Sequence, residues 1–107
     1  MKSALLSLAC TSFLFSTAAL AQIQSARVEG TVVDSSKALV PAAKVSLVNS
    51  RSQLKLDAET DSTGFYVFPT VQPGFYTLGA EAPGFRKASI TNLEVNIGVS
   101  LRQEIRL

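Results

Sequence analysis

The stretch TDSTGFYVFPTVQPGFYTLGAEAPGF, residues 60–85, decides the fold of this 107-residue chain. Two runs in it, 65–68 and 76–80, are rich in the aromatic and aliphatic side chains typical of β-strands. The segment DSTG before the first run offers an Asp that starts a turn and a Gly that accepts a positive φ. Pro73-Gly74 joins a fixed φ to a permissive residue. The stretch therefore predicts a β-hairpin, which holds all the aromatic residues found beyond residue 21.

Short strands continue on both sides of this hairpin. In residues 53–59 and 99–107, apolar and polar residues alternate with a period of two, broken in the second stretch only at Gln103. Beyond residue 21 no segment has the sustained 3.6-residue period of a helix. Strands of this length, separated by turns, favour an all-β antiparallel sandwich of two sheets. Seven strands are expected, near residues 28–33, 44–48, 53–59, 65–68, 76–80, 87–95 and 99–107.

The alternation also assigns faces to these strands. Phe65 and Phe75 are out of phase with Tyr66 and Tyr76, so we expect these phenylalanines on an outer face or near a sheet edge. The residues expected to point inward are Val28, Val32, Val45, Leu47, Tyr66, Phe68, Val71, Tyr76, Leu78, Ala80, Ile90, Leu93, Val95, Leu101 and Ile105.

Several segments match one family pattern in order and spacing. Residues 60–68 (TDSTGFYVF), 71–78 (VQPGFYTL) and 82–85 (APGF) are similar to T-D-x-x-G-x-Y-x-F, L-x-P-G-x-Y-x-L and A-x-G-F. Upstream, residues 28–34 (VEGTVVD) and 41–47 (PAAKVSL) are similar to G-x-V-x-D and P-G-A-x-V-x-L. Together these segments resemble the carboxypeptidase regulatory-like domain.

The resemblance extends over about residues 27 to 107 and implies a seven-stranded, transthyretin-like β-sandwich of the carbohydrate-binding-like class. In metallocarboxypeptidases this domain accompanies the protease domain and is not catalytic. In many Gram-negative bacteria it follows the signal peptide of TonB-dependent outer-membrane receptors. Lys37 and Ala42 depart from the pattern, because the family often has Gly at both positions. Since a lysine at positive φ costs roughly 1 kcal/mol, we expect this turn to take another shape.

Residues 1–21, MKSALLSLACTSFLFSTAALA, have the features of a secretory signal peptide. Lys2 precedes an uncharged segment with an apolar centre, and Ala19-Leu20-Ala21 supplies small residues before a cut. We expect cleavage before Gln22, which leaves residues 22–107 as one exported domain, periplasmic, associated with the outer membrane or secreted. An uncleaved anchor is the alternative. Because Ser and Thr interrupt the apolar centre, it falls short of the roughly 20 apolar residues of a spanning helix, and no membrane span is expected after cleavage.

The composition excludes most kinds of chemistry. The chain has no His, and its one Cys and one Met lie within the expected signal peptide, so zinc sites and nucleophile–base pairs cannot be built. A net charge of +2 is too small for a nucleic-acid partner. Asp57, Glu59 and Asp61 cluster, but the alternation places the first two on a solvated face and the third in a turn. We therefore expect no enzyme activity, no metal and no cofactor.

The aromatic residues outside the expected core form the candidate binding surface: Phe65 and Phe75, with Phe85. Exposed rings of this kind stack on sugars or pack against a partner protein, and the alternative is that they cap the core or a domain interface. We expect a secreted, non-enzymatic module of the bacterial envelope that binds a carbohydrate or an envelope protein, or acts as a spacer. The alternative role is the N-terminal extension of a TonB-dependent outer-membrane receptor, truncated or encoded separately.

Overall fold

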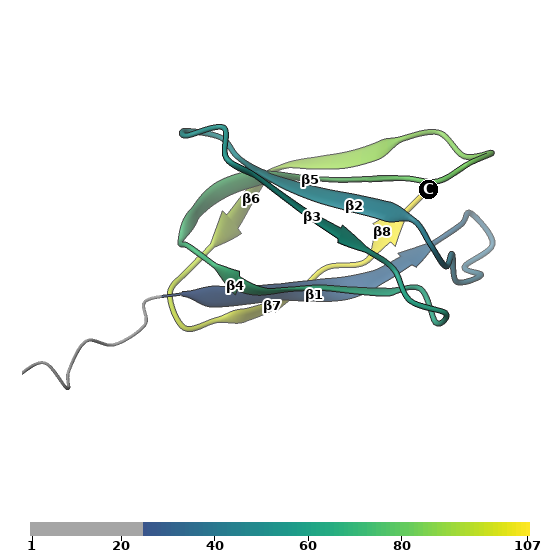
Figure 1. The fold of residues 1–107 in the computed structure, drawn as a ribbon, viewed down its shortest axis with the longest axis horizontal. Coiled ribbons are helices and arrows are strands. Elements are labelled where there is room, and N and C mark those ends of the chain that lie inside the picture. Colours follow the sequence, from purple (N-terminus) through teal and green to yellow (C-terminus); the bar gives the residue numbers. More distant parts are fainter. Residues whose placement is uncertain (1–24) are drawn as a thin grey trace, which may run out of the picture.

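The computed structural model describes residues 25–107, which form two β-sheets packed face to face (Figure 1). The expected signal peptide and the first residues after it lie outside the described range. Within that range, no helix is long and apolar enough to cross a membrane. The strands are β1 (Ala26–Val33), β2 (Lys44–Asn49), β3 (Lys55–Glu59), β4 (Phe65–Val71), β5 (Gly74–Glu81), β6 (Ala88–Val95), β7 (Ser100–Arg102) and β8 (Ile105–Arg106).

The strand order confirms an all-β sandwich but corrects two details of the prediction. One sheet has the order β4-β1-β7, with β8 also paired to β1, and the other has the order β3-β2-β5-β6. There are eight strands rather than seven, because the stretch expected as one last strand is divided into β7 and β8. The sandwich is also not wholly antiparallel, since β1 pairs in parallel with both β7 and β8.

The break between β7 and β8 falls at Gln103, the residue that interrupts the alternation in the sequence. Its backbone N–H donates to the carbonyl of Glu29 at 2.8 Å, and its carbonyl accepts the Tyr66 hydroxyl at 2.6 Å. These contacts draw Gln103 toward β1 and out of the regular ladder. On both sides of it the strands pair with β1, at Arg102 opposite Glu29 and at Ile105 opposite Val32.

The central pair of strands is not a hairpin, which is a further correction. β4 pairs with β1, whereas β5 pairs with β2 and β6 in the other sheet, so the chain crosses between layers at Gln72 and Pro73. Tyr66 and Tyr76 therefore fill the interior from opposite sheets, and both are almost fully buried. The aromatic stretch decides the fold by supplying one strand to each layer.

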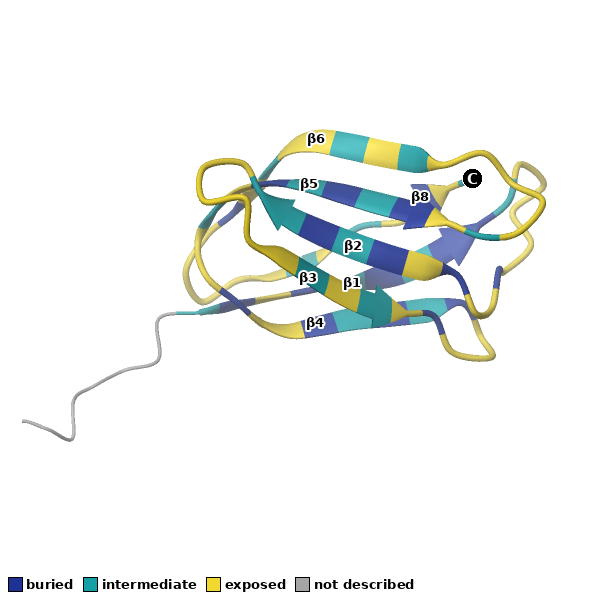
Figure 2. Ribbon diagram, turned by 45° about the horizontal axis from the view of Figure 1, so that its top comes forward, coloured by how far each residue is buried: buried dark blue, intermediate teal, exposed yellow. Residues whose placement is uncertain are grey.

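The inner faces of the two sheets form one hydrophobic core, visible as alternating buried and exposed positions along the strands (Figure 2). Twelve of the fifteen residues expected to point inward are buried. Ile90, Leu93 and Leu101 pack against the core but are only half-buried. Leu54, in phase with the inner face of the strand expected there, lies before β3 and is 60% exposed.

The turn that carries Lys37 adopts the positive-φ backbone that a lysine at this position disfavours. Lys37 has φ 72° and Ala42 has φ 57°, so both occupy the left-handed region. The Asp34 carboxylate holds the first turn by accepting hydrogen bonds from the Ser36 hydroxyl and N–H and from the Ala38 N–H. Led by the bond from the Ser36 hydroxyl, they lower the pKa of Asp34. The expectation that this turn would change shape is wrong, because local hydrogen bonds offset the cost of positive φ.

Candidate functional site

The three phenylalanines expected to bind a ligand lie in three different parts of the sandwich. Phe65 begins the edge strand β4 and is half-buried opposite Thr31 of β1. Phe75 is on the outer face of β5 in the other sheet and is 52% exposed. Phe85, 42% exposed, belongs to the loop between β5 and β6. Phe65 and Phe75 thus have the outer positions that their phase predicts.

These rings do not form one surface. Phe65 and Phe75 belong to different sheets and lie toward opposite ends of the sandwich, because β4 runs from one end to the other before β5 begins (Figure 1). Phe85 follows β5, at the far end of that strand from Phe75. A single aromatic platform is therefore not assembled, and a binding role for any one ring stays a prediction.

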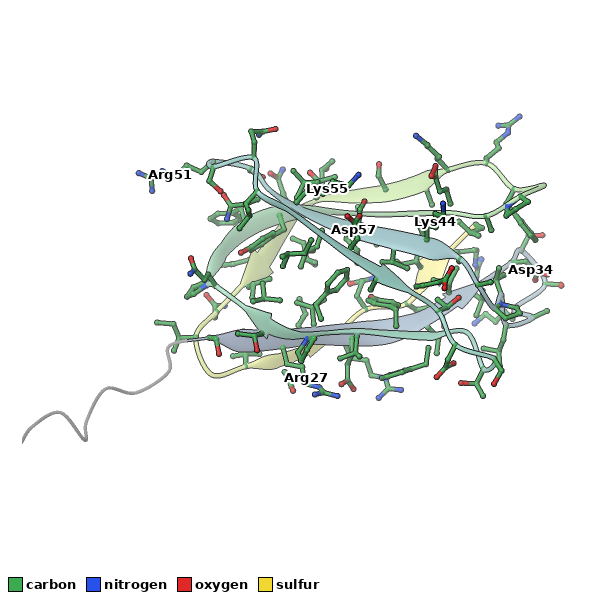
Figure 3. The ribbon with its side chains drawn as sticks, viewed as in Figure 1. Arg27, Asp34, Lys44, Arg51, Lys55 and Asp57 are labelled. Carbon is green, nitrogen blue, oxygen red and sulfur yellow. The ribbon has the colours of Figure 1, made fainter. Side chains whose placement is uncertain are left out.

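A groove of about 830 Å³, lined mainly by charged and small residues, lies instead on the outer face of the sheet β3-β2-β5-β6. Figure 3 shows Lys44, Lys55 and Asp57 on this face, pointing away from the side chains packed between the layers. The groove contains no aromatic side chain. We call it the outer groove.

Strand register orders the side chains of the outer groove into rows that cross the sheet. Lys44 of β2 lies opposite Glu59 of β3 and Glu81 of β5. Lys87, just before β6, comes within 3.5 Å of the Glu81 carboxylate. These residues form a charged row, Glu59–Lys44–Glu81–Lys87, in which negative and positive groups alternate. Opposite charges on neighbouring strands stabilise a sheet by fractions of a kcal/mol per pair.

The next row consists of small and polar residues and forms the floor. Ser46 of β2 lies opposite Asp57 of β3 and Gly79 of β5, and Gly79 in turn lies opposite Ser89 of β6. Because Gly79 has no side chain, the middle of this polar row is open; a Cβ there would lie 3.3 Å from the Ser46 hydroxyl oxygen. The long side chains of the charged row stand beside this low floor and make one wall of the outer groove.

The outer groove offers hydrogen-bond donors and acceptors rather than a reactive centre. The two serine hydroxyls and the Asp57 carboxylate of the polar row lie beside a wall that carries ammonium groups and further carboxylates. No group of His, Cys, Asp or Glu in residues 25–107 is arranged to hold a metal ion. Asp61 lies in the turn before β4, where its carboxylate accepts the Thr63 hydroxyl at 2.7 Å. That hydrogen bond, with others from backbone N–H groups, lowers the pKa of Asp61.

Sequence reasoning found part of this site and missed its centre. The alternation placed Asp57 and Glu59 on a solvated face, as they are. It gave no sign that Ser46, Gly79 and Ser89 would adjoin, because their contact depends on pairing between distant strands. The available signal was the small residue Gly79 in phase with the outer face of its strand.

The sequence profile of the carboxypeptidase regulatory-like domain matches residues 27–107. This chain belongs to that family. The match covers almost the whole described sandwich and confirms the resemblance read from the central stretch. The domain that defines this family is a non-catalytic, regulatory-like domain. A comparison with curated proteins gives no match.

Solved structures similar to this domain share its fold at low sequence identity. A protein of Bacteroides uniformis described as carbohydrate binding has a TM-score of 0.63 and 15% identity, over 76% of this chain and 40% of that one. A mutant catechol 1,2-dioxygenase of Acinetobacter radioresistens has a TM-score of 0.59 and 14% identity, over 85% and 54% of the two chains. The dioxygenase domain of a carbohydrate-binding fusion from Streptomyces sp. SirexAA-E has a TM-score of 0.54 and 9% identity, over 78% and 79%.

The chain spans 40% and 54% of the lengths of the first two proteins. At such identities these similarities establish a common β-sandwich and nothing about activity.

Proposed function

We propose that this carboxypeptidase regulatory-like domain is a non-enzymatic binding module of the bacterial envelope that holds a neutral carbohydrate in the outer groove. The observation that carries the proposal is the outer groove itself, an exposed hollow whose floor is hydroxyl-rich and whose wall alternates in charge. A sugar presents hydroxyls that both donate and accept hydrogen bonds, so it can pair with carboxylates and ammonium groups at once.

Charge balance favours a neutral ligand over an ionic one. The outer groove is lined by three lysines, Lys44, Lys55 and Lys87, and by three carboxylates, Asp57, Glu59 and Glu81. Two pairs already neutralise each other, Lys55 with Asp57 at 3.8 Å and Lys87 with Glu81 at 3.5 Å. A strongly anionic or cationic ligand would therefore meet like charges as often as opposite ones. The similar fold of a protein described as carbohydrate binding supports the same class of ligand.

The variant Gly79→Val tests this site by filling the middle of the floor. Its side chain would point into the outer groove, so we expect at least about tenfold weaker sugar binding. Titration of the protein with a panel of neutral oligosaccharides, followed by two-dimensional NMR, measures binding; we expect shifts at Ser46, Gly79 and Ser89.

Thr70→Val is the matched control, since it adds a valine at an exposed position of β4 in the other sheet. It should bind as the wild type does. If no oligosaccharide perturbs the groove amides, or if Gly79→Val binds as tightly as Thr70→Val, the outer groove is not the site.

The proposed envelope role also requires export. Expression of the full chain in a Gram-negative host should yield a periplasmic protein that begins at Gln22, as measured by intact-mass spectrometry. Ala21→Arg places a large charged residue at the expected cleavage site and should leave the chain uncut. A wild-type protein that keeps Met1 in the cytoplasm would contradict export. Recovery of the free domain from its native cells, without an attached receptor, would exclude the alternative role as a receptor extension.

A further inference from the structure

β6 is the most open of the strand edges in the described sandwich. It lies at the border of its sheet (Figure 2). It runs for eight residues and is uncharged from Ala88 to Leu93. The other edges are shielded in ways that prevent pairing with another chain. β3 carries three charged residues in five, β4 contains Pro69, and β7 has only three residues.

The hydrophobic core is incompletely buried along the side of the sandwich that β6 borders. Ile90 and Leu93 of β6 and Leu101 of β7 are the three residues that the sequence pattern assigns to the core and the structure leaves half-buried. All three belong to edge strands of the two sheets, on the side of the sandwich where β6 contacts β8. Their common location indicates that a further strand beside β6 would complete the burial.

The sequence of β6 is complementary to itself when two copies run antiparallel. Asn92 has φ 56° and is the extra residue of a bulge, because Tyr76 and Leu78 of β5 pair with Leu93 and Ile90. As a result Ala88, Ile90 and Leu93 face inward, while Ser89, Thr91 and Glu94 face outward.

A twofold axis at Ile90 would pair this strand with a second copy without mismatch. Ile90 would meet Ile90 of the partner subunit, and Ala88 would meet Leu93 of the partner subunit once each bulge is allowed for. On the outer face Ser89 would meet Thr91 of the partner subunit, and Lys87 would meet Glu94 of the partner subunit. Inward residues would thus meet inward residues, and both ends would place opposite charges side by side.

We propose that the edge of β6 is an interaction surface for a second copy of this chain, and that two domains join there into one continuous eight-stranded sheet. The interface is isologous, with each β6 supplying the same backbone groups and side chains to the other. It would cover Ile90 and Leu93 and satisfy the free hydrogen-bonding groups of the longest open edge.

The arrangement has a consequence for binding, which rests on the proposed function. A twofold axis perpendicular to the sheet leaves the outer faces of both copies on the same side. Ser89 and Lys87, which line the outer groove, adjoin the same edge, so the two grooves would lie next to each other. A ligand long enough to occupy both would gain avidity without any new contact.

Exchanging the charges of Lys87 and Glu94 tests the proposed interface. Sedimentation equilibrium of the protein as exported should show a monomer–dimer equilibrium that weakens with added salt. Lys87→Glu sets two like-charge pairs across the interface, so the dimer dissociation constant should rise about tenfold or more. The double variant Lys87→Glu with Glu94→Lys restores both opposite pairs and should regain dimerisation.

Contacts within one chain cannot explain why the double variant would regain dimerisation. Lys87 lies 3.5 Å from Glu81 within its own chain, and that favourable contact is lost in both variants. A matched control is Lys55→Glu on the far edge, which should leave the dimer unchanged.

A direct measurement needs no variant. In a mixture of isotope-labelled and unlabelled wild type, an intermolecular NOE is expected around Ile90. A protein that stays monomeric up to about 1 mM would overturn the proposal, as would a dimer that Lys87→Glu does not weaken or that gives no such NOE. None of these results depends on sugar binding, so either proposal can fail alone.

Discussion

Gly30→Ala is expected to destabilise the domain by about 3 kcal/mol or more. A Cβ added at Gly30 would lie 1.9 Å from the carbonyl oxygen of Gln103 and 2.7 Å from its carbonyl carbon. These are backbone atoms, so no side-chain rotation relieves the overlap. The same Cβ would come within 3.0 Å of the Tyr66 hydroxyl oxygen.

The Gln103 backbone cannot move away without losing other interactions. Its N–H donates to Glu29, and its carbonyl accepts the Tyr66 hydroxyl. β7 and β8 hold it on both sides through their pairing with β1. Urea denaturation followed by circular dichroism measures the loss of unfolding free energy, and the fall in the midpoint should be large compared with the usual effect of a surface substitution.

Gly79→Ala is the matched control for this prediction, because Gly79 is also a strand glycine. A Cβ there would lie 3.3 Å from the Ser46 hydroxyl oxygen, the end of a side chain that can rotate. Gly79→Ala should therefore leave the free energy of unfolding almost unchanged. The lower conformational entropy of its unfolded chain stabilises the folded variant slightly. Equal losses in Gly30→Ala and Gly79→Ala would mean that glycine flexibility, and not the close approach of Gln103, explains both.

Period-two alternation predicted most of the strands, most of their inward-facing residues and the β-sandwich, because these depend on neighbours along the chain. Val28, Leu47 and Leu78 are fully buried where the alternation places them. Even the irregular position was visible, since Gln103 interrupts the apolar row of the last stretch. The structural reason for that interruption is the contact of Gln103 with Gly30 and Tyr66, which lie far from it in the sequence.

Strand partners could not be predicted in the same way. A Pro-Gly pair serves a hairpin and a crossing between sheets equally well, so the pattern around Pro73 did not reveal that β4 and β5 belong to different layers. The outer groove was missed for the same reason, since Ser46 and Gly79 adjoin only through the pairing of β2 with β5. The half-burial of Ile90 reflects its place on an edge strand, which one strand's own sequence does not specify.

Tyr66→Ala is expected to cost about 3–5 kcal/mol of unfolding free energy. Tyr66 is the largest of the fully buried side chains, at 1% exposure, and its ring packs edge-on against Phe68 with centroids 6.0 Å apart. Tyr66→Phe keeps the ring and removes only the hydroxyl, so about 1 kcal/mol should be lost with the hydrogen bond to Gln103. Tyr76→Phe is the matched control, since its hydroxyl donates to the Gln72 carbonyl at the same distance of 2.6 Å.

The Tyr66 hydroxyl also makes stability depend on alkaline pH. Burial, with a smaller effect from the Glu29 carboxylate, raises the pKa of Tyr66 above its ordinary value of 10.0. The folded state therefore keeps the proton that the unfolded chain releases, so this stabilisation is complete below pH 10 and declines as the pH rises further. Urea midpoints measured from neutral pH to about pH 11 should fall more steeply for the wild type and Tyr76→Phe than for Tyr66→Phe. Parallel declines in all three proteins would show that Tyr66 ionises as freely in the folded state as in the unfolded chain, against the burial that its position implies.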